Sequence, residues 1–207
     1  MFTIFYPHIE LHSSPDVPFK NFNRSHFRII IMFRLCVNEF TEYYDPTLEE
    51  TYRAKIDYAG KLYNIEIVDT AGQEEFSSFR DSSLATGDAF LVLFAINSAS
   101  SWHELKELRT KIIDEHESKN NCTIPMVIVA NKVDLEDERE TQKDEVMEYC
   151  NSLGTPFIET SAKTGLNIQE CFQLMMRQIQ RIQPSLLERT VPINYAENDK
   201  KKDCSIL

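Results

Sequence analysis

The tetrapeptide Asn131-Lys132-Val133-Asp134 has residue types that could recognise one particular base. It directly follows the apolar run "MVIVA". A carboxylate here can accept hydrogen bonds from two neighbouring N–H groups, which guanine offers on one edge and adenine does not. Leaving that carboxylate unpaired against adenine would cost roughly 1–3 kcal/mol or more. We expect the Asp134 carboxylate to read guanine, with the Lys132 stem over the ring; a solvated loop is the alternative.

Two further polar stretches complete this chemistry. In "ETSAK", the small residues at Ser161 and Ala162, followed by Lys163, would let backbone amides approach a carbonyl oxygen of the base. In "DTAGQEEF", Asp69 could reach Mg²⁺ through water, and Gln73 could orient a water for in-line attack on a phosphate. For both stretches the alternative is an ordinary turn after a strand.

Composition limits the classes of protein that could carry these stretches. The 207 residues suffice for one α/β domain, and the net charge of −11 argues against nucleic acid as a partner. The five cysteines form no metal-binding or disulfide pattern and are read as reduced thiols. The first residues lack the positive charge of a signal peptide, and no stretch is long enough to span a bilayer.

Strands and helices alternate from about Thr51 onward. Two strands joined near Ala59-Gly60 form a hairpin, and the continuous apolar run "AFLVLFAINS" predicts a strand buried on both faces. Ser101 opens a helix whose apolar stripe is Trp102, Leu105, Leu108 and Ile112. This order predicts a doubly wound, mostly parallel sheet with helices on both faces, whose ligands bind at the carboxyl ends of the strands.

The second half of the chain continues the pattern. The strand "MVIVA" is followed by a polar loop, a helix around Lys143 to Leu153, and a short last strand within "TPFIETSAK". Asn167 and Glu170 suggest a capping box for the last helix, which ends before Pro184. All three polar stretches therefore follow strands, where a ligand of such a sheet would lie.

Together with "YDPT" at residues 44–47, these stretches make the chain resemble the Ras subfamily of small GTPases, from Ile30 to Gln183 and in the last four residues. The resemblance implies a G domain of the P-loop NTPase class over residues 30–183, which binds GTP or GDP with Mg²⁺ and hydrolyses GTP. It also implies effector, exchange-factor and GTPase-activating proteins as partners. Two loops would then order or disorder with the γ-phosphate.

Position by position, the resemblance assigns roles to individual residues. Gln73 would be catalytic; Thr47, and Asp69 through water, would hold Mg²⁺. The nucleotide-binding residues would be Phe40, Thr47, Asp69, Thr70, Ala71, Gly72, Asn131, Lys132, Asp134, Ser161, Ala162 and Lys163. The effector-facing region would be Tyr44, Asp45, Pro46, Thr47, Leu48, Glu49, Glu50, Thr51 and Tyr52.

The glycine-rich phosphate loop of this family, G-x-x-x-x-G-K-[ST], is missing. Counted back without gaps from Thr47, its window is "FNRSHFRI" at residues 22–29, with Arg28 in the place of the lysine and Ile29 in that of the hydroxyl. The first glycine of the chain is Gly60. Losing the lysine and several amide contacts could total ~5 kcal/mol, which weakens phosphate affinity by on the order of 10³–10⁴-fold.

Residues 1–29 therefore form an atypical segment. The ungapped equivalent of the first strand, "SPDVPFKN", contains two prolines and makes a poor central strand. "FTIFY" at residues 2–6 or "FRIIIMF" at residues 27–33 could replace it, and both alternatives stay open. A match that starts abruptly near Ile30 is typical of an alternative or wrongly joined first coding segment. A pseudo-GTPase, or a fragment that cannot complete its sheet, are the competing explanations.

The end of the chain indicates membrane attachment. "CSIL" fits the C-a-a-X pattern, and its final leucine favours a geranylgeranyl group on Cys204. Residues 184–207 are expected to be a flexible tail carrying this lipid. We expect a guanine-nucleotide switch at the cytoplasmic face of the plasma membrane or an endomembrane. The alternative is a non-hydrolysing interaction protein with effector-like surfaces.

Overall fold

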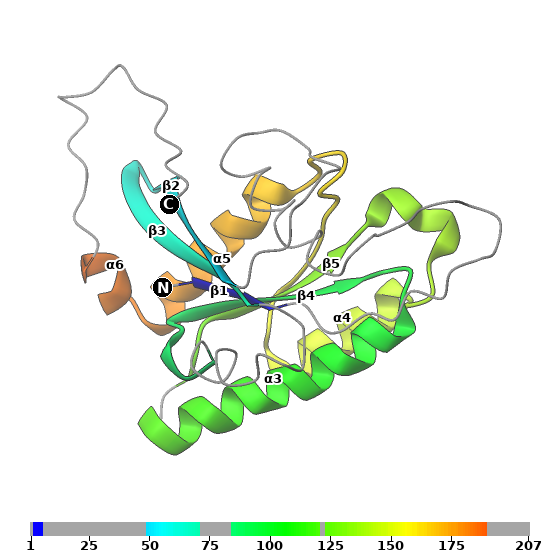
Figure 1. Cartoon of the computed structure of the whole chain (residues 1–207), viewed down its shortest axis with the longest axis horizontal. Helices are drawn as coiled ribbons and strands as arrows, with labels where there is room; N and C mark the ends of the chain where they lie inside the picture. The colour runs from blue at the N-terminus through cyan, green and yellow to red at the C-terminus, as the bar shows by residue number, and fades with distance from the viewer. Residues whose placement is uncertain (1, 6–48, 71–83, 121–122, 190–207) are drawn as a thin grey trace.

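The computed structural model describes residues 2–5, 49–70, 84–120 and 123–189. Its centre is a six-stranded sheet with the order β2-β3-β1-β4-β5-β6, drawn in Figure 1. The strands are β1 Phe2–Phe5, β2 Glu49–Tyr58, β3 Lys61–Thr70, β4 Ala89–Ala95, β5 Met126–Asn131 and β6 Phe157–Glu159. Only the β2–β3 pair is antiparallel; the other four pairs are parallel. The predicted mostly parallel α/β sheet is confirmed.

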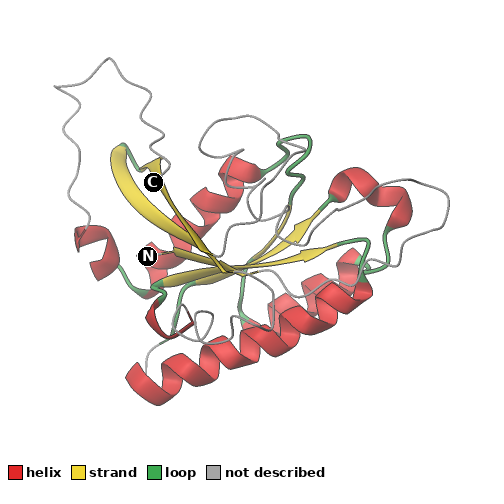
Figure 2. Cartoon of the chain, in the orientation of Figure 1, coloured by secondary structure: helices red, strands yellow, loops and turns green. Residues whose placement is uncertain are grey.

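Helices cover both faces of this sheet (Figure 2). The helices are α3 Ala99–Asn120, α4 Lys143–Leu153, α5 Ile168–Ile182 and the short α6 Ser185–Arg189, with a 3₁₀ segment η2 at Val133–Glu138. Strand β4 is buried along its whole length, as its continuous apolar run predicted. Leu91 and Leu93 belong to the core beneath α5, whereas Phe90 and Phe94 belong to the core beneath α3 and α4. This alternation lets one strand serve two cores.

The central strand β1 comes from the atypical first segment. It lies parallel to both neighbours, with Thr3 opposite Val68 of β3 and Phe90 of β4. The structure thus uses "FTIF", the first of the two alternatives, and the hypothesis of an incomplete sheet is wrong. The other candidates, at residues 14–21 and 27–33, and the phosphate-loop window at 22–29 lie outside the described residues.

The predicted hairpin between β2 and β3 is confirmed. Its two turn residues, Ala59 and Gly60, have φ angles of 52° and 73°. Two successive positive φ values are the signature of a type I′ turn, whose twist matches that of the flanking strands. Gly60 adopts this conformation at no steric cost, which explains the position of the first glycine of the chain.

Helix α3 begins at Ala99, two residues earlier than predicted from Ser101. Ser98 is the residue that satisfies the helix start, since its Oγ accepts a hydrogen bond from the Ser101 N–H at 3.3 Å. Ser101 is instead buried, and its own hydroxyl donates to the Ser98 carbonyl at 2.7 Å. The apolar stripe of this helix is confirmed, because Trp102, Leu105 and Ile112 are buried and Leu108 packs against them.

The predicted capping box of α5 is wrong. Asn167 has a left-handed backbone, with φ 56° and ψ 19°, and its side chain makes no capping hydrogen bond. The Asn167 Nδ2 donates to the carbonyl of Glu159 at 2.8 Å. The side chain therefore ties the start of α5 to the end of β6.

The first residues of the predicted flexible tail form a short helix. Residues 185–189 form α6, and Leu186 and Leu187 pack against the core that α5 shares with the sheet. Within the described residues, no helix is long and apolar enough to cross a membrane. Residues 190–207, including Cys204, lie outside the described part of the chain.

Candidate functional site

Strands β5 and β6 bring two of the three polar stretches together. Ala130 lies opposite Glu159 in the parallel register, so Asn131-Lys132 and Thr160-Ser161 leave the sheet side by side. Two backbone hydrogen bonds join these exits: Thr160 N–H donates to the Ala130 carbonyl at 2.7 Å, and Val133 N–H donates to the Thr160 carbonyl at 3.2 Å. The prediction that both stretches directly follow strands is therefore confirmed, and the structure places those two strands side by side.

The carboxamide of Asn131 is fully buried at this junction. Its Oδ1 accepts from the Thr160 hydroxyl at 3.3 Å and from the Ala162 N–H at 3.2 Å. Its Nδ2 is buried as well and has no acceptor among the described residues. A buried amide without an acceptor costs roughly 1–3 kcal/mol, so the arrangement leaves a fixed donor for an outside partner.

Lys132 makes the sharp turn after β5 without a glycine. Its φ of 68° and ψ of 33° lie in the left-handed region, which costs a non-glycine residue about 1–2 kcal/mol. The residue is only 8% exposed. Burial lowers the pKa of its ammonium group, and the negative charges of Asp134 and Glu138 partly oppose that effect. A strained and buried lysine next to exposed carboxylates is typical of a binding site rather than of a solvated loop.

Asp134 and Ser161 connect the two loops through their side chains. The Ser161 Oγ donates to Asp134 Oδ1 at 2.5 Å and accepts from the Thr164 N–H at 3.1 Å. The hydrogen bond from the Thr164 N–H orients the Ser161 hydroxyl toward Asp134. Because a carboxylate has about four acceptor sites, this contact uses only part of the capacity of Asp134. The carboxylate is exposed and held in one orientation.

An ion-pair network that the sequence analysis missed supports both loops from outside. Arg139, which ends η2, donates from its NH2 group to Glu136 at 2.6 Å and to Glu159 at 2.9 Å. Lys143 adds a contact to Glu159 at 2.7 Å. Arg139 and Glu159 are 10% and 17% exposed, so solvent screens their pair less than a surface pair. The hydrogen bonds to Glu136 and Glu159 raise the pKa of Arg139.

Thr160 was missed as well. It is fully buried, and it binds Asn131 through its hydroxyl and Ala130 and Val133 through its backbone. A hydroxyl residue immediately after a strand, in a position that faces inward, was the available signal. Arg139 had a weaker one, because the pairing of two charges 20 positions apart depends on the tertiary structure.

The phosphate and metal half of the predicted site is largely beyond the described residues. Asp69 and Thr70 end β3, and Asp69 lies opposite Ile4 of β1 in the register. Like Asn131, they lie at the carboxyl end of their strand. Glu49 to Tyr52 begin β2, the edge strand. The remaining predicted residues, Phe40, Tyr44 to Leu48, Ala71, Gly72 and Gln73, fall in the undescribed segments. The described part holds no cluster of three metal-binding side chains.

Comparisons with known proteins agree with this arrangement. Residues 28–181 match the model of the Ras family. The chain is 37% identical over 172 residues to "Ras-like protein rasB" of Dictyostelium discoideum, covering 82% of this chain and 86% of that protein. It is 37% identical over 179 residues to "Ras-like protein rasC" of the same organism, covering 86% and 90%. "Protein ras-1" of Neurospora crassa is 36% identical over 169 residues, covering 82% and 78%.

Strand β1, at Phe2–Phe5, precedes the residues that match the family model, yet it occupies the centre of the sheet. The matched residues contain the buried Asn131 junction, the Asp134–Ser161 contact and strand β3, whose last two residues are Asp69 and Thr70. The resemblance inferred from short sequence stretches thus extends over most of the chain. The protein belongs to the Ras family of small GTPases.

Proposed function

We propose that this Ras-family chain is a membrane-attached guanine-nucleotide switch whose base-recognition loops are intact and whose phosphate binding is weak. The family implies guanine nucleotide and Mg²⁺ as ligands in general. A bound nucleotide supplies the γ-phosphate whose presence or loss sets the state of such a switch. The chain's own residues decide how tightly each part of that ligand is held.

The unpaired Nδ2 of Asn131 is the observation that carries the proposal. This donor is buried and fixed by two hydrogen bonds to the opposite end of its own carboxamide. Acceptors such as N7 or O6 on the guanine ring would satisfy it. Asp134 would accept from the N1–H and 2-amino groups, and the Lys132 stem would cover the ring. The residues present therefore fit the base.

The chain offers fewer suitable groups for binding the phosphates than for binding the base. A phosphate loop needs successive backbone amides at conformations that glycine adopts easily. The residues after β1 read "YPHIELHSS", and the ungapped window at 22–29 reads "FNRSHFRI"; neither contains a glycine. The loss is therefore the same whichever stretch takes the place of the loop. Gln73, Thr47 and Asp69 would keep their roles, but a phosphate that is not held in line is hydrolysed slowly.

The surfaces for protein partners and for the membrane are proposed from the place of β2 in the sheet and of Cys204 in the sequence. Glu49 to Tyr52 begin β2, an edge strand of the described sheet, which is a position where partner proteins can add to a sheet. Effectors, exchange factors and GTPase-activating proteins are the partner classes expected of this family. A prenyl group on Cys204 would attach the chain to the cytoplasmic face of a membrane.

Nucleotide content tests the proposal directly. The full chain is purified, denatured, and the released nucleotides are separated by chromatography. We expect well under one equivalent of GTP plus GDP, and no Mg²⁺-dependent hydrolysis above background. With added nucleotide at high concentration, guanine should still compete better than adenine. One equivalent of guanine nucleotide released from the unaltered chain would show that the missing glycines matter little.

A repaired chain provides the positive control. Residues 1–29 are replaced by a strand followed by a G-x-x-x-x-G-K-S loop in frame with Ile30. Restored binding and slow turnover would locate the defect in the first segment. A repaired chain that remains empty would place the fault among the residues proposed to be intact.

A non-hydrolysing interaction protein is the second candidate function, and the absence of glycine before Gly60 favours it. It differs from the first in one measurable respect. A switch binds an effector differently with GTP and GDP, whereas a constitutive interaction protein binds it equally with either nucleotide or none.

A further inference from the structure

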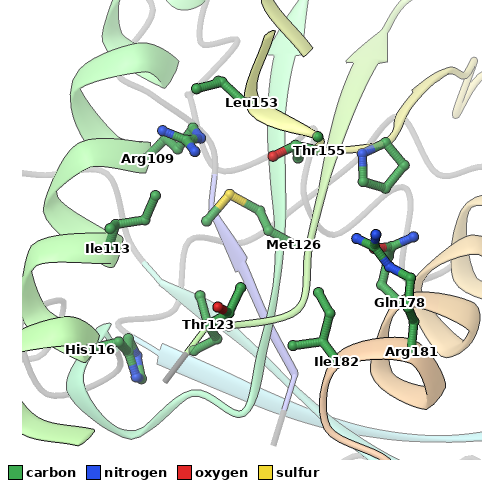
Figure 3. A pocket seen from close by; sticks show the side chains of 13 residues that line it. Arg109, Ile113, His116, Thr123, Met126, Leu153, Thr155, Gln178, Arg181 and Ile182 are labelled. Atoms are coloured by element: carbon green, nitrogen blue, oxygen red, sulfur yellow. The ribbon is translucent and has the colours of Figure 1, made fainter. Parts of the chain in front are cut away.

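A cavity of about 200 Å³ (Figure 3) lies at the amino end of β5, which is the end opposite the candidate base site. Its walls come from α3, α5 and the connection between α4 and β6. Its floor includes Met126, the first residue of β5, whereas Asn131 is the last residue of the same strand. The cavity is therefore separate from the loops that would hold a nucleotide.

The charge of the cavity contrasts with that of the whole chain. The net charge is −11, yet among the described residues the lining contains Arg109, Arg181 and His116 and no aspartate or glutamate. His116 Nε2 lies 2.7 Å from the Leu84 carbonyl, which fixes the ring as part of the wall. The two guanidinium groups give the cavity a positive field that favours an anion.

Arg109 has a buried donor without an acceptor among the described residues. Its Nε is out of contact with water and has no hydrogen-bond partner among the described residues. Burial raises the pKa of the Tyr149 hydroxyl. The charge of Arg109 and a hydrogen bond from another part of its guanidinium partly oppose this shift. An unsatisfied charged donor in the interior is costly, so an acceptor from a ligand would be well placed here.

Arg181 stands on α5, across the cavity from Arg109 on α3, as Figure 3 shows. Its NH2 group donates to Gln178 Oε1 at 2.7 Å, which orients the guanidinium and leaves other N–H donors for a ligand. The lining also includes the apolar side chains of Ile113, Met126 and Ile182. The cavity thus combines an apolar floor with cationic walls.

We propose that this cavity binds a small organic carboxylate, with its apolar body over Met126 and its charge facing the guanidinium groups that line the walls. A carboxylate matches the planar donor fork of arginine. The volume is below the ~300–1,000 Å³ of sites for drug-sized ligands, so the ligand is a fragment-sized acid. The site is independent of the proposed nucleotide binding.

Titration calorimetry and saturation-transfer NMR on the full chain test this site. The probe is phenylacetate, and phenylacetamide, which has the same shape without the charge, is the matched neutral ligand. We expect a Kd for phenylacetate on the order of a millimolar, as befits about ten non-hydrogen atoms. The amide should bind at least tenfold more weakly, because it lacks the charge-assisted hydrogen bonds.

Three variants complete the test. Arg181→Met and Arg109→Met should each weaken phenylacetate binding about tenfold or more. Arg177→Met, on the exposed face of α5 and outside the cavity lining, should leave it unchanged. Arg181 is exposed, so its replacement should not disturb folding even if that of Arg109 does. Equal binding of acid and amide, equal losses in Arg177→Met and Arg181→Met, or no binding at tens of millimolar would overturn the proposal.

Discussion

At the scale of single residues, the base-site loops are defined by a few buried polar contacts. Asn131 is fixed through Oδ1 by Thr160 and Ala162, and Ser161 orients Asp134. The side chains in these contacts are buried or held from two sides. A substitution that replaces a single atom of such a side chain should therefore alter ligand choice without unfolding the chain. Asp134 is exposed and therefore the best position for such a change.

Asp134→Asn should change base preference from guanine toward xanthine. The amide of asparagine offers a donor that the C2 carbonyl of xanthine can accept, while the 2-amino group of guanine loses its acceptor. We expect the ratio of affinities to shift by about ten- to a hundredfold, measured by competition in the unaltered and the repaired chain. Asp137→Asn, at an exposed position of the same turn, is the control and should change nothing. Equal binding of adenine and guanine nucleotides by the unaltered chain would refute the roles proposed for residues 131–134.

Cys171 should make the chain sensitive to alkali. Burial raises its thiol pKa from 9.0 to about 12 in the folded state. Between these values the unfolded chain loses a proton that the folded chain keeps, so stability is full below pH 9 and falls as pH rises.

Urea unfolding of the unaltered chain and of Cys171→Ala at pH 7 and pH 10 measures this effect. The decrease in unfolding free energy between the two pH values should be smaller in the variant by on the order of 1 kcal/mol. Cys150, whose pKa burial also raises to about 12, accounts for part of the remaining decrease. An identical decrease in both proteins would show that Cys171 does not contribute.

At the scale of elements, β1 is an interior strand of the sheet. Four residues from a segment that precedes the family match pair with β3 on one side and β4 on the other. A central strand must satisfy backbone groups on both sides, which explains why "SPDVPFKN" with its two prolines is a poor candidate and "FTIF" a good one.

Ile4→Pro tests the central strand. Ile4 lies opposite Asp69 and Leu91, and proline would remove an N–H and clash with the neighbouring backbone. We expect a loss of about 3 kcal/mol or more in unfolding free energy, measured by urea or thermal unfolding. Glu49→Pro, at the first residue of the edge strand β2, is the matched control and should cost far less. Comparable stability of the two variants would mean that β1 does not hold the central place in solution.

At the scale of the whole molecule, the base-site loops, the edge strand β2 and the carboxylate cavity occupy different parts of one sheet. The two helical layers bury separate cores on the two faces of that sheet. Attachment to a membrane is proposed through a prenyl group on Cys204. Near Cys204, Lys200, Lys201 and Lys202 are offset by Glu197, Asp199 and Asp203, so little polybasic attraction remains.

Cys204→Ser should therefore move the protein from the membrane fraction to the soluble fraction in cells. A single lipid chain contributes ~0.8 kcal/mol per buried CH₂, and nothing else in the tail replaces it. Leu207→Ser keeps a C-a-a-X ending and should stay membrane-bound. Fractionation followed by immunoblotting is sufficient to compare them. Continued membrane association of Cys204→Ser would show that another part of the chain is the anchor.

The sequence by itself determined the class of fold, the hairpin turn and the positions of the base-site loops. Continuous apolar runs specify strands locally, Ala59-Gly60 marks the hairpin, and parallel strands place their carboxyl ends on one side of the sheet. The family resemblance followed from the same short stretches. Each of these features depends on residues close together in the chain.

Only the tertiary structure decided which segment forms the central strand, and how the loops are held. Phe2–Phe5 and residues 27–33 both suit a strand locally, and pairing with β3 and β4 selects the first. The capping box at Asn167 failed because the side chain binds Glu159, whose position depends on β6. The Arg139–Glu159 pair and the buried Asn131 donor likewise join residues that are distant in sequence. Contacts of this kind depend on the packed sheet, which local patterns do not specify.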